Sequence, residues 1–99
     1  MDYLTKYNFT RNDIELIENS ISETELKNVK MNAKNIMNVV EYLNSLGITK
    51  DTMRDLFIYQ IGIFHRTKNE LEQVFDEYEI ESIVKSLNYD VNTIDMVEF

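Results

Sequence analysis

The sequence contains no cysteine and no proline, and only two of its 99 residues are glycine. Without cysteine there is no disulfide, no thiolate nucleophile and no thiolate metal ligand. This composition suits a reducing compartment, so we expect a cytoplasmic protein. Proline and glycine interrupt helices, and their scarcity favours helices joined by short connections over a sheet with many turns.

Long apolar runs are also absent. No stretch approaches the roughly eighteen apolar residues that cross a bilayer, and the first residues lack the apolar core of a signal peptide, so we expect no membrane segment. Hydrophobic residues make up 43% of the chain and charged residues 28%, which is an ordinary globular mixture. We expect one domain spanning residues 1–99.

Apolar residues recur at steps of three and four, the spacing that places side chains on one face of a helix. The clearest stripe comprises Ile36, Val39, Val40, Leu43 and Leu46. Residues typical of helix N-caps precede the stripes at Thr10, Ser22, Thr49, Thr67 and Asp90. We therefore predict an all-α fold, with helices near residues 10–20, 23–30, 33–46, 50–60, 68–78, 80–87 and 91–98.

One twelve-residue pattern occurs three times, as YLTKYNFTRNDI, YLNSLGITKDTM and IVKSLNYDVNTI, beginning at residues 3, 42 and 83. Its sixth position holds residues that tolerate the left-handed conformation after a helix: Asn8, Gly47 and Asn88. Its seventh holds residues that can pack back onto the next helix: Phe9, Ile48 and Tyr89. The spacings of 39 and 41 residues are typical of stacked helical repeats, so we expect a small helical repeat or a compact helical bundle.

The run VVEYLNSLGITKDTMRDLFIYQIGIFHRTKNELEQVF resembles the repeat of the mitochondrial transcription termination factor (mTERF) family. The stop between two helices of that repeat is matched by Leu43, Leu46, Gly47 and Ile48, and its apolar pair is matched by Ile63 with Phe64. Gly62 stands where the family usually has proline. The resemblance covers about one unit, residues 39–78, with partial units on either side. It implies a curved stack of short helices, and in the family such stacks bind nucleic acid.

Charge is distributed unevenly along the chain. Residues 1–69 contain nine acids and nine bases, whereas residues 70–99 contain nine acids and only Lys85, so the whole net charge of −8 arises in the last third. Nucleic-acid binding depends on lysine and arginine side chains that neutralise phosphates, and the acidic last third disfavours it. The basic residues available for such a role are Lys27, Lys30, Lys34, Arg54, Arg66 and Lys68.

The segment DEYEIE at residues 76–81 places acids beside apolar residues. On a helical face it would present negative charge and an aromatic anchor to a basic protein partner, and the residues concerned are Asp76, Glu77, Tyr78, Glu79 and Glu81. The alternative is an acidic face that only keeps the chain soluble. The apolar residues near the carboxyl end also leave open a homo-oligomer through that edge, unless Asp90, Asp95 and Glu98 form its polar cap.

Catalysis has little support in the sequence. His65 is the sole histidine, and acidic pairs such as Glu77 with Glu81 are typical of solvated helix faces rather than dry pockets. There is no Cys/His metal pattern, no calcium-binding loop and no glycine-rich phosphate loop. We therefore predict no enzymatic activity, no cofactor and no metal.

Two functional hypotheses follow. The first is a small regulatory, immunity or inhibitor protein whose acidic carboxyl-terminal face binds a basic protein. The second is a miniature mTERF-like protein that binds nucleic acid through its lysine and arginine side chains.

Overall fold

The computed structural model describes residues 1–97, and within this range every regular element is a helix. The all-α prediction is therefore confirmed. In chain order the elements are η1 (Asp2–Tyr7), α1 (Arg11–Ser20), α2 (Glu23–Met31), α3 (Ala33–Leu46), α4 (Lys50–Tyr59), η2 (Ile61–His65), α5 (Lys68–Phe75), α6 (Ile80–Tyr89) and η3 (Val91–Met96), where η denotes a 3-10 helix.

The predicted N-caps explain where most of these helices begin. The hydroxyls of Ser22, Thr49 and Thr67 each accept a hydrogen bond from the backbone N–H three residues further along. At α1 the arrangement is a complete capping box, because Thr10 accepts from the N–H of Asp13 and the Asp13 carboxylate accepts from the N–H of Thr10. Each such cap satisfies a donor that the first turn leaves without a helical partner.

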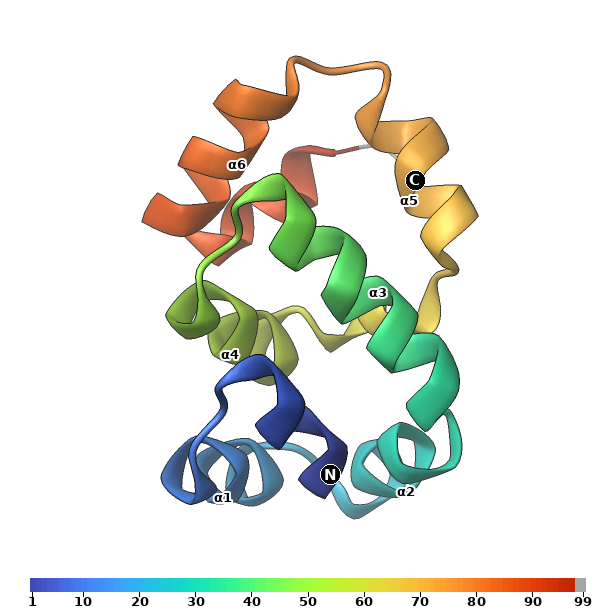
Figure 1. Cartoon of the computed structure of the whole chain (residues 1–99), viewed down its shortest axis with the longest axis vertical. Coiled ribbons are helices and arrows are strands. Elements are labelled where there is room, and N and C mark those ends of the chain that lie inside the picture. The colour runs from blue at the N-terminus through green and yellow to red at the C-terminus, as the bar shows by residue number, and fades with distance from the viewer. Residues whose placement is uncertain (98–99) are drawn as a thin grey trace.

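The helices stack along the long axis of a molecule that measures 33 × 22 × 22 Å. Figure 1 shows α4 above α1, and α4 contacts α1 on one side and η3 on the other. Each of these three elements begins at the ninth position of a copy of the repeated pattern. The elements that end at the corner residues of the first two copies, η1 and α3, also contact each other. The chain therefore places its repeated segments in successive layers.

The hydrophobic core gathers around α3 and α4. Leu43 and Phe57 are fully buried, and the ring of Phe57 stacks on that of Phe64 with centroids 3.8 Å apart. α3 contacts η1, α2, α5 and η2, so this helix packs against elements from most of the chain. The apolar pair Ile63 and Phe64 is buried as a short 3-10 turn, which the periodicity did not predict because it is too short to show a helical stripe.

Two of the three predicted left-handed corners are confirmed. Asn8 has φ 71° and Gly47 has φ 102°, and each ends the helix before it. The prediction for Asn88 is wrong, because α6 continues through this residue to Tyr89 and the chain leaves the helix at Asp90 with an extended backbone. The Asn88 side chain is used instead. Its amide donates to the carbonyl of Gly47 and its oxygen accepts from the N–H of Thr49, so α6 clamps the corner between α3 and α4.

Other boundaries differ at the carboxyl-terminal end. The helix expected over residues 68–78 ends at Phe75, and the segment expected to be a helix at 91–98 is the 3-10 helix η3, which ends at Met96. The aromatic residue predicted to pack beside the third corner, Tyr89, is 93% exposed, whereas Phe9 and Ile48 at the equivalent positions are buried. The longer α6 turns the Tyr89 ring away from the core.

Candidate protein-binding surface

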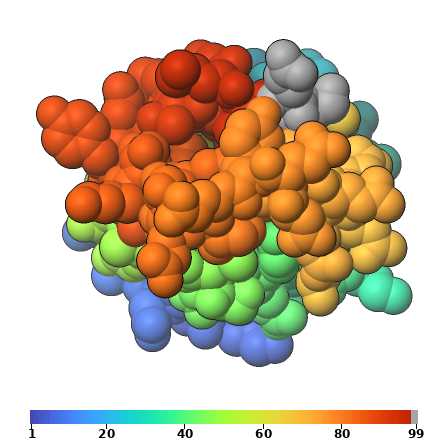
Figure 2. Space-filling view, turned by 90° about the horizontal axis from the view of Figure 1, so that it is seen from above, coloured from blue at the N-terminus to red at the C-terminus, as the bar shows by residue number. Residues whose placement is uncertain are grey.

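The predicted partner-binding residues lie together at one end of the long axis. Asp76, Glu77, Tyr78 and Glu79 form the connection between α5 and α6, and Glu81 follows in the first turn of α6. We call these five residues the acidic pole. All five are exposed, and Figure 2 shows the α5–α6 connection crossing the surface at this end of the molecule.

The connection is a tight turn rather than the continuous helical face that the sequence suggested. The backbone N–H of Asp76 still donates to the carbonyl of Glu72, but those of Glu77 and Tyr78 donate to carbonyls three residues back. Phe75 anchors the turn, since its buried ring stacks on Tyr42 with centroids 6.4 Å apart. The carboxylates of the acidic pole are therefore presented around a bend that is fixed by a buried aromatic residue.

Negative charge at this end is not balanced locally. Within residues 1–97, the carboxylates of Asp76, Glu77, Glu79 and Glu81 have no ion-pair partner. Burial raises the pKa of Tyr42, and the nearby carboxylates of Glu72 and Asp76 raise it further. Glu79 and Glu81 lie at the N-terminus of α6, where the helix dipole favours an anion. The charge is thus tolerated by the fold and remains accessible from solvent.

The two apolar residues of DEYEIE behave differently. Ile80 is half-buried and packs against the core. Tyr78 is 36% exposed and lies between Glu77 and Glu79 in the turn. A partially exposed tyrosine provides apolar contact area at small entropic cost, which suits an interface. Only Tyr78 therefore remains a candidate anchor.

The basic residues proposed for nucleic-acid binding do not form one surface. Arg54 is engaged inside the molecule, where it pairs with the carboxylates of Asp13, Asp51 and Asp55 at 3.4–3.5 Å. Arg66 pairs with Glu70 and Lys68 with Glu72. The remaining three are exposed on α2 and at the start of α3, and none has an ion pair among the described residues: Lys27, Lys30 and Lys34.

Asp13 has a role that the sequence revealed only in part. Besides capping α1, its buried carboxylate lies 3.0 Å from the Lys50 ammonium and 3.4 Å from the Arg54 guanidinium, both on α4. Its pKa lies well below the ordinary range, chiefly because the carboxylate accepts a hydrogen bond from the backbone N–H of Thr10, and Lys50 lowers it further. The Thr-x-x-Asp spacing revealed the cap. Nothing in the spacing predicted that Asp13 would contact Lys50 and Arg54, which lie 37 and 41 positions further along the chain.

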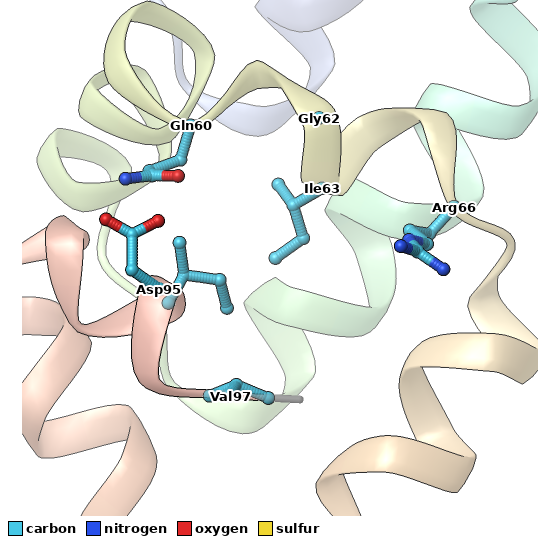
Figure 3. A pocket seen from close by; sticks show the side chains of 7 residues that line it. Gln60, Gly62, Ile63, Arg66, Asp95 and Val97 are labelled. Carbon is cyan, nitrogen blue, oxygen red and sulfur yellow. The ribbon is translucent and has the colours of Figure 1, made fainter. Parts of the chain in front are cut away.

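A cleft of about 380 Å³ lies between η2 and η3. Figure 3 shows Ile63 and Val97 along it, with Gln60 beside Asp95 on one side and Arg66 on the other. Of the apolar residues near the carboxyl end, Ile94 and Val97 are buried and Met96 is 80% exposed. Asp90 and Asp95 are exposed on this edge, as a polar cap requires, while Glu98 and Phe99 lie outside the described residues. A homo-oligomer through this edge stays a prediction.

His65 is exposed at the end of η2. No three His, Asp or Glu side chains within residues 1–97 are grouped so that they could hold a metal ion. No helix among these residues is long and apolar enough to cross a membrane.

No family model, no curated protein and no solved structure matches this chain. The mTERF-like resemblance therefore stays a prediction from the residues that carry it.

Proposed function

We propose that this protein is a non-enzymatic protein-binding module of the regulatory, immunity or inhibitor type, which docks its acidic pole on a basic surface of a protein partner. The observation that carries the proposal is the set of four exposed carboxylates at one end of the molecule with no ion pair among the described residues. A basic partner relieves the mutual repulsion of these carboxylates, accelerates encounter and disfavours acidic competitors.

The shape of the acidic pole supports the same role. A turn held by the buried Phe75 presents the carboxylates with little loss of conformational entropy on binding. The exposed part of Tyr78 adds an apolar contact to the acidic pole. A partner surface that normally holds nucleic acid has the matching chemistry, since phosphate-binding sites are rich in lysine and arginine.

Charge reversal with a matched control tests this function. The pole variant carries Asp76→Lys, Glu77→Lys, Glu79→Lys and Glu81→Lys, and the control carries Glu15→Lys, Glu18→Lys, Glu23→Lys and Glu25→Lys on α1 and α2. Each set adds eight charges and brings the formal net charge from −8 to 0. Both sets also remove two acids near a helix N-terminus, so their effects on helix stability are comparable.

Each immobilised protein is exposed to cell extract, and captured proteins are identified by mass spectrometry after circular dichroism has verified the helical fold. Wild type and control are expected to capture the same basic protein, and the pole variant is expected to lose it. Equal capture by the pole variant would show that the acidic pole serves solubility alone.

Nucleic-acid binding is the second candidate, favoured by the three exposed lysines without ion pairs on α2 and α3. The measurement is binding to short DNA and RNA at low and moderate salt. Affinity that falls steeply with salt and disappears when Lys27, Lys30 and Lys34 become glutamate would establish this function in place of the first. An absence of binding at low salt would remove it.

A further inference from the structure

A second, smaller cleft lies where α4 meets the end of α6. Its volume is about 210 Å³, and its walls include Asp55 and Tyr59 from α4 and Tyr89 and Asp90 from the end of α6. Leu87 forms a buried apolar part of its lining. We call this site the tyrosine cleft. Drug-sized ligands occupy pockets of roughly 300–1,000 Å³, so this cleft suits a single side chain better than a metabolite or cofactor.

Packing of the hydrophobic core does not explain the presence of tyrosine at positions 59 and 89, because both side chains are largely exposed. Tyr89 is 93% exposed, while the residues at the equivalent pattern position, Phe9 and Ile48, are 4% and 2% exposed and fill the core. Tyr59, the last residue of α4, is 67% exposed. Exposed tyrosines around a concave site are typical of recognition surfaces, because each ring offers a large contact area with few rotatable bonds.

The charge at the cleft indicates a cation. The Asp90 side chain accepts one hydrogen bond, from the N–H of Asn92, and has no ion pair within residues 1–97. Asp55 lies across the cleft and is neutralised only in part, by the Arg54 guanidinium at 3.5 Å. Two carboxylates repel phosphate, which excludes a nucleotide from this site. A cationic group that stacks on aromatic rings and pairs with carboxylates can interact with all four side chains: Asp55, Tyr59, Tyr89 and Asp90.

We propose that the tyrosine cleft binds an arginine side chain of the protein partner. Guanidinium is planar, stacks on aromatic faces and donates two parallel hydrogen bonds to a carboxylate, whereas the ammonium of lysine is a compact point charge that requires more hydration. This inference rests on the proposed function. α6 begins at the acidic pole and ends at the tyrosine cleft, so a basic partner segment lying along one helix of about 15 Å meets both.

The probe is the peptide acetyl-Gly-Arg-Gly-amide, titrated into the isotope-labelled full chain and followed by NMR chemical shifts. Its matched control replaces arginine by citrulline, which has the same shape without the charge. The arginine peptide is expected to shift the resonances of Tyr59, Tyr89 and Asp90 in a saturable way, and citrulline is expected to have little effect. Equal binding of both peptides, or shifts centred on the acidic pole, would overturn the assignment.

Variants give the second measurement. Tyr59→Ala and Tyr89→Ala are each expected to weaken peptide binding about two- to fivefold, as loss of one exposed cation–π contact implies. Asp90→Asn keeps an oxygen for the Asn92 N–H but removes the charge, so it is expected to weaken binding without unfolding η3. Met31→Ala at the end of α2 is the control, because this 73% exposed side chain does not line the cleft, and it is expected to bind normally. Unchanged affinity in the first three variants refutes the inference.

These experiments distinguish a failure of the proposed protein-binding function from a failure of the proposed arginine site. The pole variant is expected to bind the arginine peptide within about a factor of two of wild type while losing its partner, because direct contacts in the cleft remain. If cleft variants bind the peptide normally but the pole variant loses the partner, the inference falls and the proposed function stands. If the pole variant retains the partner while the cleft binds arginine, the proposed function falls and the arginine site stands.

Discussion

Replacing Asp13 by alanine removes one carboxylate that performs two structural tasks. It accepts from the Thr10 N–H at 2.9 Å to complete the capping box of α1, and it holds Lys50 and Arg54 of α4. Loss of a cap costs about 0.5–2 kcal/mol. A hydrogen bond to a charged group contributes about 1.5–3 kcal/mol when buried, and solvent reduces this here because the Lys50 and Arg54 side chains are 35% and 25% exposed.

Allowing about 1 kcal/mol for each cation, Asp13→Ala is expected to lower the free energy of unfolding by about 2.5–4 kcal/mol at neutral pH. Total stabilities of small domains are about 5–15 kcal/mol, so this loss is large enough to measure. Asp13→Asn retains an oxygen acceptor for the cap and loses the charge, and it is expected to cost less than alanine. The control is Glu15→Ala, whose exposed side chain pairs only with Arg11 among the described residues.

Urea unfolding followed by circular dichroism measures these differences in the free energy of unfolding. Repeating the measurement at acid pH tests whether the Asp13 charge is responsible for them. Because the folded-state pKa of Asp13 is depressed, its contribution is fully present above the ordinary carboxyl value near 3.8 and is lost as pH falls toward the folded-state pKa. The gap between wild type and Asp13→Ala should therefore be constant from pH 7 to about pH 5 and narrow below about pH 4. A cost under about 0.5 kcal/mol, or a gap unaffected by acid, would refute the double role.

The remaining predictions concern the core, the corners and alkaline stability. Leu43→Ala is expected to cost about 2–5 kcal/mol in urea unfolding, because it empties a fully buried site. Gly47→Ala is expected to cost about 1–2 kcal/mol from its φ of 102°, whereas Gly62→Ala, with open space around the new methyl group, should change stability by less than about 0.5 kcal/mol. Asn88→Ala should cost about 1 kcal/mol by releasing the α3–α4 corner, and an unaltered unfolding midpoint would contradict the clamp. Burial raises the pKa of Tyr3 to about 12, so its stabilising contribution is present below pH 10 and lost as pH rises through about 12. The pKa of Tyr7 is also raised to about 12, so absorbance at alkaline pH should show more than one late-titrating tyrosine, and Tyr3→Phe should remove one of them.

The sequence predicted those parts of the fold that short-range chemistry controls. The caps at Thr10, Ser22, Thr49 and Thr67 are local hydrogen bonds between residues three positions apart, and their spacing is visible in the sequence. The acidic pole was identified in the same way, since its charged residues are contiguous and contiguous acids remain together in any fold. Its shape was not predicted, because the helix expected to carry it ends at Phe75.

The tyrosine cleft illustrates what short-range reasoning missed. The pattern assigned Tyr89 the buried role of Phe9 and Ile48, and the aromatic residue itself agreed with that assignment. The decision depended on how far α6 extends, and the Asn88 side chain favours the longer helix by bonding to residues about 40 positions earlier. Tyr59 reaches the same cleft from α4, and no sequence spacing connects the two rings.

By itself, the sequence determined the helical class, the starts of most helices, the left-handed corners at Asn8 and Gly47 and the concentration of negative charge in the last third, because each depends on backbone preferences or on neighbours within one turn. Only the tertiary structure decided that Asn88 stays helical, that Arg54 is engaged internally with Asp13, and that two tyrosines from separate helices flank one cleft. These outcomes depend on contacts between distant segments, whose geometry is set when the layers pack against one another.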